Sequence, residues 1–239
     1  MSIDKTMCRV LGFCVAILLL FTAYAQQRSK PSNELTAKST FHSATAPTFW
    51  HHQRKGANGG GGANPEEWFR AAAEVGIEFV RLSPATRESE SRDFLLGNAN
   101  HFTKIPERDF QKLRNVLDIA NRHNVKVVLT MFSLPGARWR QQNNYQFDYR
   151  IWKEEKYQQQ ALAFWKELAG RLKGHAAVVG YNPVNEPHPS RKDGYEDGNT
   201  EGFEEWLTEH ENGTADLNRF NRRVVEAIRS EDPITPIVL

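Results

Sequence analysis

The stretch that decides the fold is AVVGYNPVNEP, residues 177–187. Its first half is short, apolar and rich in β-branched residues, and it follows a segment with helical periodicity. This is typical of a parallel strand that is buried on both faces, and we expect the strand to continue to the carboxylate of Glu186 and to stop at Pro187. Polar groups come only at its end, where Asn185 and Glu186 precede Pro187. Because ligands bind at the carboxyl ends of strands in α/β sheets and barrels, we expect Asn185 and Glu186 to lie at a site of chemistry. Taken alone, Asn-Glu-Pro is also compatible with an ordinary solvated turn.

The segments on either side repeat the order of strand and helix. Apolar residues at helical spacing predict helices over about residues 64–76, 106–124, 156–174 and 215–230. Apolar runs predict strands over about residues 77–82, 125–132 and 237–239. A change of composition near Phe49 precedes a further short strand, which we expect over residues 53–58, directly before a glycine run. Strands that alternate with helices imply right-handed crossovers and a parallel sheet. The connections that follow the strands are long, as in β/α barrels, which build their active sites there; an open α/β sheet is the alternative.

A run of four glycines, residues 59–62, precedes a strong helix start at Asn64, Pro65 and Glu66. We expect this run to form a tight loop between strand and helix. It lacks the GxGxxG spacing and the Gly-Lys-Ser/Thr ending that direct backbone amides and a lysine at phosphate groups. The sequence therefore argues against a nucleotide site.

The first residues have the pattern of a secretory signal. A basic start with Lys5 and Arg9 precedes an apolar run, and Ala23-Tyr24-Ala25 forms an A-x-A cleavage site. We expect a signal peptide over residues 1–25, a flexible leader over 26–47 and the folded domain over 48–239. An uncleaved anchor is the alternative, but the apolar run is shorter than the ~20 residues that span a bilayer. These features predict a secreted protein, or a periplasmic one in a bacterium, without stable membrane association.

The overall charge limits the class of partner. The chain carries 31 basic and 29 acidic side chains, a formal net charge of +2. Such a balance argues against a nucleic-acid partner and favours a neutral, polar ligand. His51 and His52 have no third ligand at metal spacing, so we expect neither a metal nor a cofactor.

Several of these segments resemble glycoside hydrolase family 5, the cellulase-type (β/α)8 barrels. The resemblance extends over about residues 50–239. It rests on RKGAN at 54–58, VRL at 80–82, LPG at 134–136, the stretch 152–165 and GYNPVNEP at 180–187. It implies that residues 48–239 are a partial glycoside hydrolase catalytic domain with an α/β fold, a TIM (β/α)8 barrel, of which this chain covers about the first four and a half βα units.

The resemblance also implies a retaining glycosidase in which Glu186 is the acid/base. Such enzymes use two carboxyl groups about 5–5.5 Å apart. An acid must keep its proton near neutral pH, so we expect Glu186 to be partly buried or to lie beside another carboxylate. Asn185 matches the family residue that bonds the sugar 2-hydroxyl, and Arg81 matches a positioning partner of the nucleophile. Alternatively, Arg81 is a rim cation paired with a local acid. Asn58 is a further candidate for substrate binding.

Aromatic residues follow the third predicted strand and suit a sugar ligand, because a ring face covers the C–H face of a pyranose. We expect Trp139 to face the sugar and Trp152 to pack the loop against the next helix. His188 directly follows the acid/base motif. It is a candidate to line the cleft, with a solvated loop position as the alternative.

The chain departs from the family pattern in two respects. Phe132 stands where many members carry a histidine, which removes one hydrogen bond to the sugar. The nucleophilic glutamate of the family lies on the seventh strand, beyond residue 239. We therefore interpret the chain as the N-terminal part of a longer protein, inactive alone and monomeric when complete, that acts on a β-linked oligo- or polysaccharide. The alternatives are a secreted carbohydrate-binding pseudoenzyme on the same barrel and a barrel of unrelated chemistry.

Overall fold

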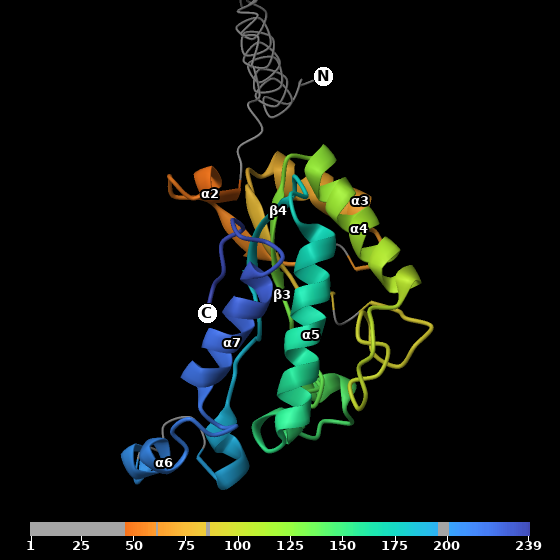
Figure 1. The fold of residues 1–239 in the computed structure, drawn as a ribbon. Helices are drawn as coiled ribbons and strands as arrows, with labels where there is room; N and C mark the ends of the chain where they lie inside the picture. Colours follow the sequence, from red (N-terminus) through yellow and green to blue (C-terminus); the bar gives the residue numbers. More distant parts are fainter. Residues whose placement is uncertain (1–45, 61, 85–86, 196–200) are drawn as a thin grey trace, which may run out of the picture. The chain divides into compact units, whose positions relative to one another are not determined.

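The central element is a four-stranded parallel sheet, seen in a computed structural model that describes residues 46–60, 62–84, 87–195 and 201–239. The strands are β1 (Gly56–Asn58), β2 (Phe79–Leu82), β3 (Lys126–Thr130) and β4 (Val178–Asn182). They pair in the order β1-β2-β3-β4, and every pair is parallel (Figure 1). The predicted parallel sheet is confirmed. A β/α barrel adds its strands in chain order, whereas a doubly wound sheet reverses direction at its switch point, so the observed order favours the barrel.

Four longer helices follow the strands in turn. They are α3 (Pro65–Glu74), α4 (Glu107–Arg122), α5 (Glu155–Leu172) and α7 (Leu217–Arg229), close to the predicted ranges. Two of them begin at a side-chain cap, because Asn64 accepts a hydrogen bond from the Glu67 amide and Asp216 accepts one from the Arg219 amide. Two short helices were not predicted, α2 (Ala46–Phe49) and α6 (Phe203–Glu209).

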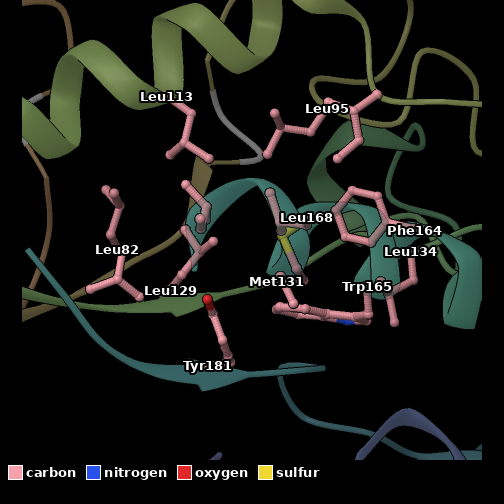
Figure 2. Packing of buried hydrophobic residues seen from close by; sticks show 14 of the residues in the cluster. Leu82, Leu95, Leu113, Leu129, Met131, Leu134, Phe164, Trp165, Leu168 and Tyr181 are labelled. Atoms are coloured by element: carbon pink, nitrogen blue, oxygen red, sulfur yellow. The ribbon is translucent and has the colours of Figure 1, made fainter. Parts of the chain in front are cut away.

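The main core lies between the sheet and these helices. Successive strand residues point to opposite faces, so Val80 and Leu82 are buried while Phe79 and Arg81 lie on the other face. Figure 2 shows Leu82, Leu129, Met131 and Tyr181 from the strands and their ends, together with Leu113, Phe164, Trp165 and Leu168 from the helices. A smaller cluster of Phe49, Phe79, Val128 and Val179 covers the inner face. Strands β3 and β4 are therefore buried on both faces, whereas β1 at the edge is largely exposed.

β4 ends earlier than predicted. The stretch 177–187 was expected to be a strand up to the carboxylate, but the strand stops at Asn182. Pro183 has no N–H group and does not continue a ladder. Beyond β4, the predicted fifth strand at 237–239 is reduced to a parallel bridge between Tyr181 and Ile237. This bridge extends the sheet beside β4, as the next strand of a barrel would.

The predicted signal peptide and nearly all of the predicted leader lie outside the described residues, so both stay predictions. Within residues 46–239, apart from the gaps at 61, 85–86 and 196–200, no helix is long and apolar enough to cross a membrane.

Candidate active site

The carboxyl ends of the strands open into a cleft of about 1150 Å³. β1 contributes Asn58 to its lining, β2 contributes Arg81, and the segment after β3 contributes Trp139. The turn after β4 contributes Asn185 and Glu186. Five of the six residues predicted for the site are thus brought together, from positions up to 128 residues apart in the chain.

Arg81 links two of these strands. It lies on the inner face because its neighbours Val80 and Leu82 are turned to the helices. Its Nη2 donates to Asn182 Oδ1 at 2.8 Å and to Asn185 Oδ1 at 2.7 Å. Both partners are amides, and within the described ranges Arg81 forms no ion pair with a carboxylate. These contacts therefore differ from the alternative in which Arg81 is a rim cation paired with a local acid.

Asn182 is a site residue that the sequence analysis missed. It is the last residue of β4, and it is buried. While its oxygen accepts from Arg81, its Nδ2 donates to the Val238 carbonyl at 2.9 Å. The available signal was a polar residue at the end of an otherwise apolar strand, directly before a proline.

The turn after β4 is tied to the end of β3 by backbone bonds. The Asn185 amide donates to the Met131 carbonyl at 2.8 Å, and the Met131 amide donates to the Asn182 carbonyl at 3.1 Å. Asn185 itself is buried. Asn185 is therefore held against the end of the sheet, although it lies beyond the last ladder position of β4.

Glu186 sits at the tip of this turn in a left-handed conformation, with φ of 47°. Residues other than glycine adopt this region at a cost of order 1–3 kcal/mol, and such positions are concentrated at functional sites. The side chain is exposed, because the turn presents it to solvent. The expectation of a partly buried carboxyl is therefore not met in this chain.

An aromatic wall lines the cleft on the β3 side. Phe132 and Trp139 contact each other with ring centroids 4.7 Å apart. The guanidinium carbon of Arg81 lies 5.9 Å from the centre of the Phe132 ring. Phe132 thus gives the cleft an apolar face at the position where the family resemblance would place a histidine. An apolar wall beside polar amides suits the mixed surface of a sugar.

The glycine run forms the opposite edge of the cleft. At Gly59 an added Cβ would collide with the ring of Trp68, and at Gly60 with Leu82, so both positions require glycine. Arg87 donates from Nη2 to the Gly60 carbonyl at 2.8 Å, and burial lowers the pKa of Arg87. Trp68 also lines the cleft and was not predicted as a site residue.

Other candidate residues lie elsewhere. His188 lines a second pocket of about 560 Å³, beside α6, rather than the cleft that holds Glu186. Trp152 is buried, as its predicted packing role requires, but its ring contacts Phe220 of α7, with ring centroids 5.3 Å apart, rather than a ring of the next helix, α5.

Two further acids, Glu78 and Glu88, flank β2 in the sequence. Glu78 pairs with Arg54 just before β1 and β2 begin, and the Lys55 amide and Arg54 lower its pKa. It therefore lies at the opposite ends of the strands. Glu88 is exposed and lines the cleft. Among the residues whose placement is described, no group of three or more His, Cys, Asp or Glu side chains is arranged to hold a metal ion.

Comparisons with known proteins agree with this geometry. The family model described as cellulase, glycosyl hydrolase family 5, matches residues 34–239. A β-xylosidase from Phanerodontia chrysosporium is 30% identical over 81 residues, which are 33% of this chain and 17% of that protein.

Solved structures show the same fold. An endoglucanase from Pseudomonas stutzeri in complex with cellobiose is similar with a TM-score of 0.50 and 22% identity, over 77% of this chain and 49% of that one. An endo-glycoceramidase from a Rhodococcus species is similar with a TM-score of 0.51 and 16% identity, over 77% of this chain and 47% of that one. The chain thus spans about half the length of these structures. It belongs to the cellulase family, glycosyl hydrolase family 5, and forms about the first four and a half units of its (β/α)8 barrel.

Proposed function

We propose that the complete protein is a secreted glycosidase that hydrolyses β-linked oligo- or polysaccharides with retention, and that Glu186 is its acid/base. The observation that carries this proposal is the contact of Arg81, on β2, with Asn185, directly beside Glu186 after β4, at the carboxyl ends of the barrel strands. Family membership supports a glycoside hydrolase, and the named residues supply roles for its chemistry.

In this proposal Glu186 protonates the glycosidic oxygen as the leaving group departs, and afterwards takes a proton from the attacking water. A second carboxylate, which we place beyond residue 239, attacks the anomeric carbon from about 5–5.5 Å away. The exposed position of Glu186 in this chain fits a site that is completed by later barrel strands. The chain alone is therefore expected to be inactive.

Asn185 is oriented for one role. Because its Oδ1 accepts from Arg81, its amide nitrogen remains as the donor for a sugar hydroxyl. A hydrogen bond to the 2-hydroxyl strengthens in the transition state, so this contact favours catalysis rather than ground-state binding alone.

The proposed substrate class rests on the lining of the cleft. Trp139, Phe132 and Trp68 supply apolar faces, and Asn58 and Asn185 supply amides. The named relatives include a β-xylosidase and an endoglucanase with bound cellobiose, so family membership leaves the sugar open. We propose a β-linked glycan bound by a monomeric, exported protein.

The test compares two glutamates of the same cleft, Glu186 and Glu88. Loss of a general acid/base lowers rates by about 10²–10⁴-fold, so Glu186→Gln is expected to reduce kcat on polysaccharide by that amount in the complete protein. Glu88→Gln serves as the matched control, because Glu88 is also exposed and lines the cleft, and it is expected to leave kcat unchanged. If Glu186→Gln hydrolyses polysaccharide and an activated aryl glycoside at near wild-type rates, Glu186 is not the acid/base.

Phe132 favours one second candidate, a carbohydrate-binding pseudoenzyme. A phenyl ring contributes stacking and no hydrogen bond at this position in the cleft. A complete protein that binds oligosaccharides in calorimetry but hydrolyses none of them would support this candidate over the enzyme.

A further inference from the structure

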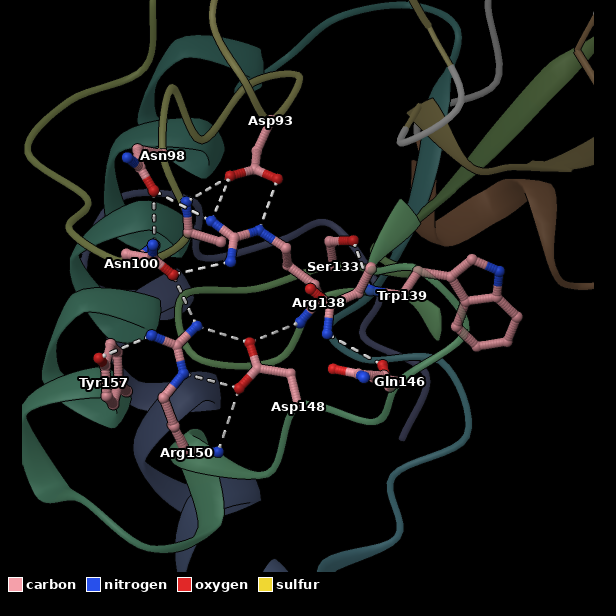
Figure 3. Close-up of polar contacts among 12 residues, drawn as sticks. Asp93, Asn98, Asn100, Ser133, Arg138, Trp139, Gln146, Asp148, Arg150 and Tyr157 are labelled. Carbon is pink, nitrogen blue, oxygen red and sulfur yellow. Dashed lines mark hydrogen bonds and ion pairs between the residues drawn. The ribbon is translucent and has the colours of Figure 1, made fainter. Parts of the chain in front are cut away.

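A buried ion pair joins the two loops that follow β2 and β3. Arg138 Nε donates to Asp93 Oδ1 and Nη2 donates to Asp93 Oδ2, both at 2.9 Å. The Arg138 side chain is 3% exposed, and that of Asp93 is 8% exposed. Figure 3 shows that amide oxygens complete this cluster, because Arg138 also donates to Asn98 Oδ1 at 3.0 Å and to Asn100 Oδ1 at 2.7 Å.

Asp93 lies in the loop after β2 and is held there by further hydrogen bonds within that loop. Asp93 Oδ2 also accepts from the Ala99 amide at 2.7 Å, and the Asp93 amide donates to the Gly97 carbonyl at 3.1 Å. Between these bonds, Phe94, Leu95 and Leu96 are buried in the main core. Asp93 is therefore a fixed reference point for the loop that follows β3.

The Arg138 side begins with a tight turn. The amides and carbonyls of Leu134 and Ala137 exchange two hydrogen bonds of 2.9 Å, and Pro135 and Gly136 stand between them. Gly136 has φ of 72°, and its amide donates to the Ala99 carbonyl at 2.9 Å. This turn sets the direction in which the chain leaves β3.

Arg138 and Trp139 point in opposite directions from the extended backbone that follows the turn. Figure 3 shows the Arg138 guanidinium beside Asp93 and the Trp139 indole on the other side of the chain. The Arg138 amide donates to Asp148 at 3.3 Å, and the Trp139 amide donates to Ser133 Oγ at 2.9 Å. The indole itself lines the cleft. Holding the Arg138 side chain therefore fixes the direction of the neighbouring ring.

We propose that Arg138 is a positioning residue that holds Trp139 as a sugar-binding wall of the cleft. This inference rests on the proposed function, because it takes the ligand to be a glycan. If the contacts of Arg138 are weakened, the loop after β3 samples more conformations. Ordering Trp139 on binding then costs conformational entropy, which lowers the affinity for the sugar. The chemistry at Glu186 lies on the turn after β4 and is held by separate contacts. Weakening the contacts of Arg138 is therefore expected to lower the affinity for the glycan and to leave kcat nearly unchanged.

The mildest way to weaken the cluster is Asn100→Ala. Asn100 is exposed, so the variant is expected to fold, yet its oxygen accepts from both Arg138 and Arg150. Asn121→Ala is the matched control, an identical change at an exposed site on α4. In the complete protein, Asn100→Ala is expected to raise KM for a β-glucan oligosaccharide about tenfold with kcat within twofold, and Asn121→Ala to change neither value.

A double-mutant cycle tests whether the effect passes through Trp139. Trp139→Ala, Asn100→Ala and the double variant are titrated calorimetrically with the same oligosaccharide in a Glu186→Gln background, so that binding is measured without hydrolysis. If Asn100 acts through Trp139, the double variant binds no more weakly than Trp139→Ala alone. Three results would overturn the inference. They are losses of binding free energy that add in the double variant, an unchanged Kd for Asn100→Ala, and no binding by any variant. A wild type that binds but does not hydrolyse would instead contradict the proposed function and leave this cycle valid.

Discussion

Two arginines of the cleft region, Arg81 and Arg138, have opposite surroundings. Arg138 is buried and is matched by the carboxylate of Asp93. Arg81 is partly exposed, and it donates to the amide oxygens of Asn182 and Asn185. A buried cation needs a counter-charge, whereas a cation at the edge of a cleft remains available to act on a ligand or a developing charge. We therefore propose that Arg138 holds the cleft wall in place and that Arg81 takes part in the chemistry.

Removing the counter-charge is expected to give the largest effect on stability. Asp93→Ala leaves Arg138 buried without its carboxylate, which typically lowers the free energy of unfolding by about 3–5 kcal/mol. Urea denaturation of the complete protein, followed by circular dichroism, measures this change. A loss below about 1 kcal/mol would place the pair among weak surface ion pairs and remove the contrast between the two arginines.

Arg81 is expected to show the reverse pattern, with a large effect on activity and a small one on stability. Arg81→Met removes the charged donor that fixes Asn185, an interaction typically worth about 1.5–3 kcal/mol, so kcat/KM is expected to fall by about tenfold to a hundredfold. Steady-state kinetics together with the unfolding midpoint check both parts. An Arg81→Met protein with normal kcat/KM would contradict the chemical role of Arg81.

A smaller difference between the loop that holds Arg138 and the strand ends that hold Arg81 is expected in how their contributions to stability depend on pH. Burial of Asp148 favours its neutral form, but Arg150 and the Arg138 amide outweigh this, and the pKa of Asp148 is lowered. The charged carboxylate thus stabilises the fold above the unfolded-state pKa of about 4, and this stabilisation is lost as the pH falls through the lower folded-state pKa.

The measurement is urea denaturation of the wild type and Asp148→Asn as a function of pH. The difference in unfolding free energy is expected to be largest above about pH 4 and to shrink on acidification. Asn182→Ala, at the strand ends, is the control, since an amide does not titrate and its difference from the wild type is expected to stay constant. A constant difference for Asp148→Asn would show that its charge does not stabilise this loop.

The regular elements of the fold could be predicted from the sequence, because apolar spacing records burial directly. The stripe that includes Trp165 and Leu168 marked α5, and the apolar run that begins at Ala177 marked β4, although not its end at Asn182. The position of Asn185 and Glu186 at the cleft could be predicted because polar residues that follow an apolar strand lie at the carboxyl end of a parallel barrel. Local sequence was sufficient to predict the position of a residue wherever that position depends only on the helix or strand to which the residue belongs.

The rest depends on partners that are distant in the chain. Arg138 and Asp93 are 45 residues apart, and Arg81 and Asn182 are 101 residues apart, so no local pattern marks either contact. Trp68 enters the cleft because Gly59 admits its ring. His188 directly follows the site motif, yet the chain turns it towards α6, a short helix that was not predicted.

The most direct test of the proposed site is a crystal structure of the complete protein with Glu186→Gln and an unhydrolysed β-linked oligosaccharide. We predict that the side chain at position 186 lies within hydrogen-bond reach of a glycosidic oxygen, about 2.6–3.2 Å, and that the Asn185 amide contacts the neighbouring 2-hydroxyl. A glycan that binds outside the cleft, or that crosses it with no glycosidic oxygen near position 186, would contradict the assignment of this site.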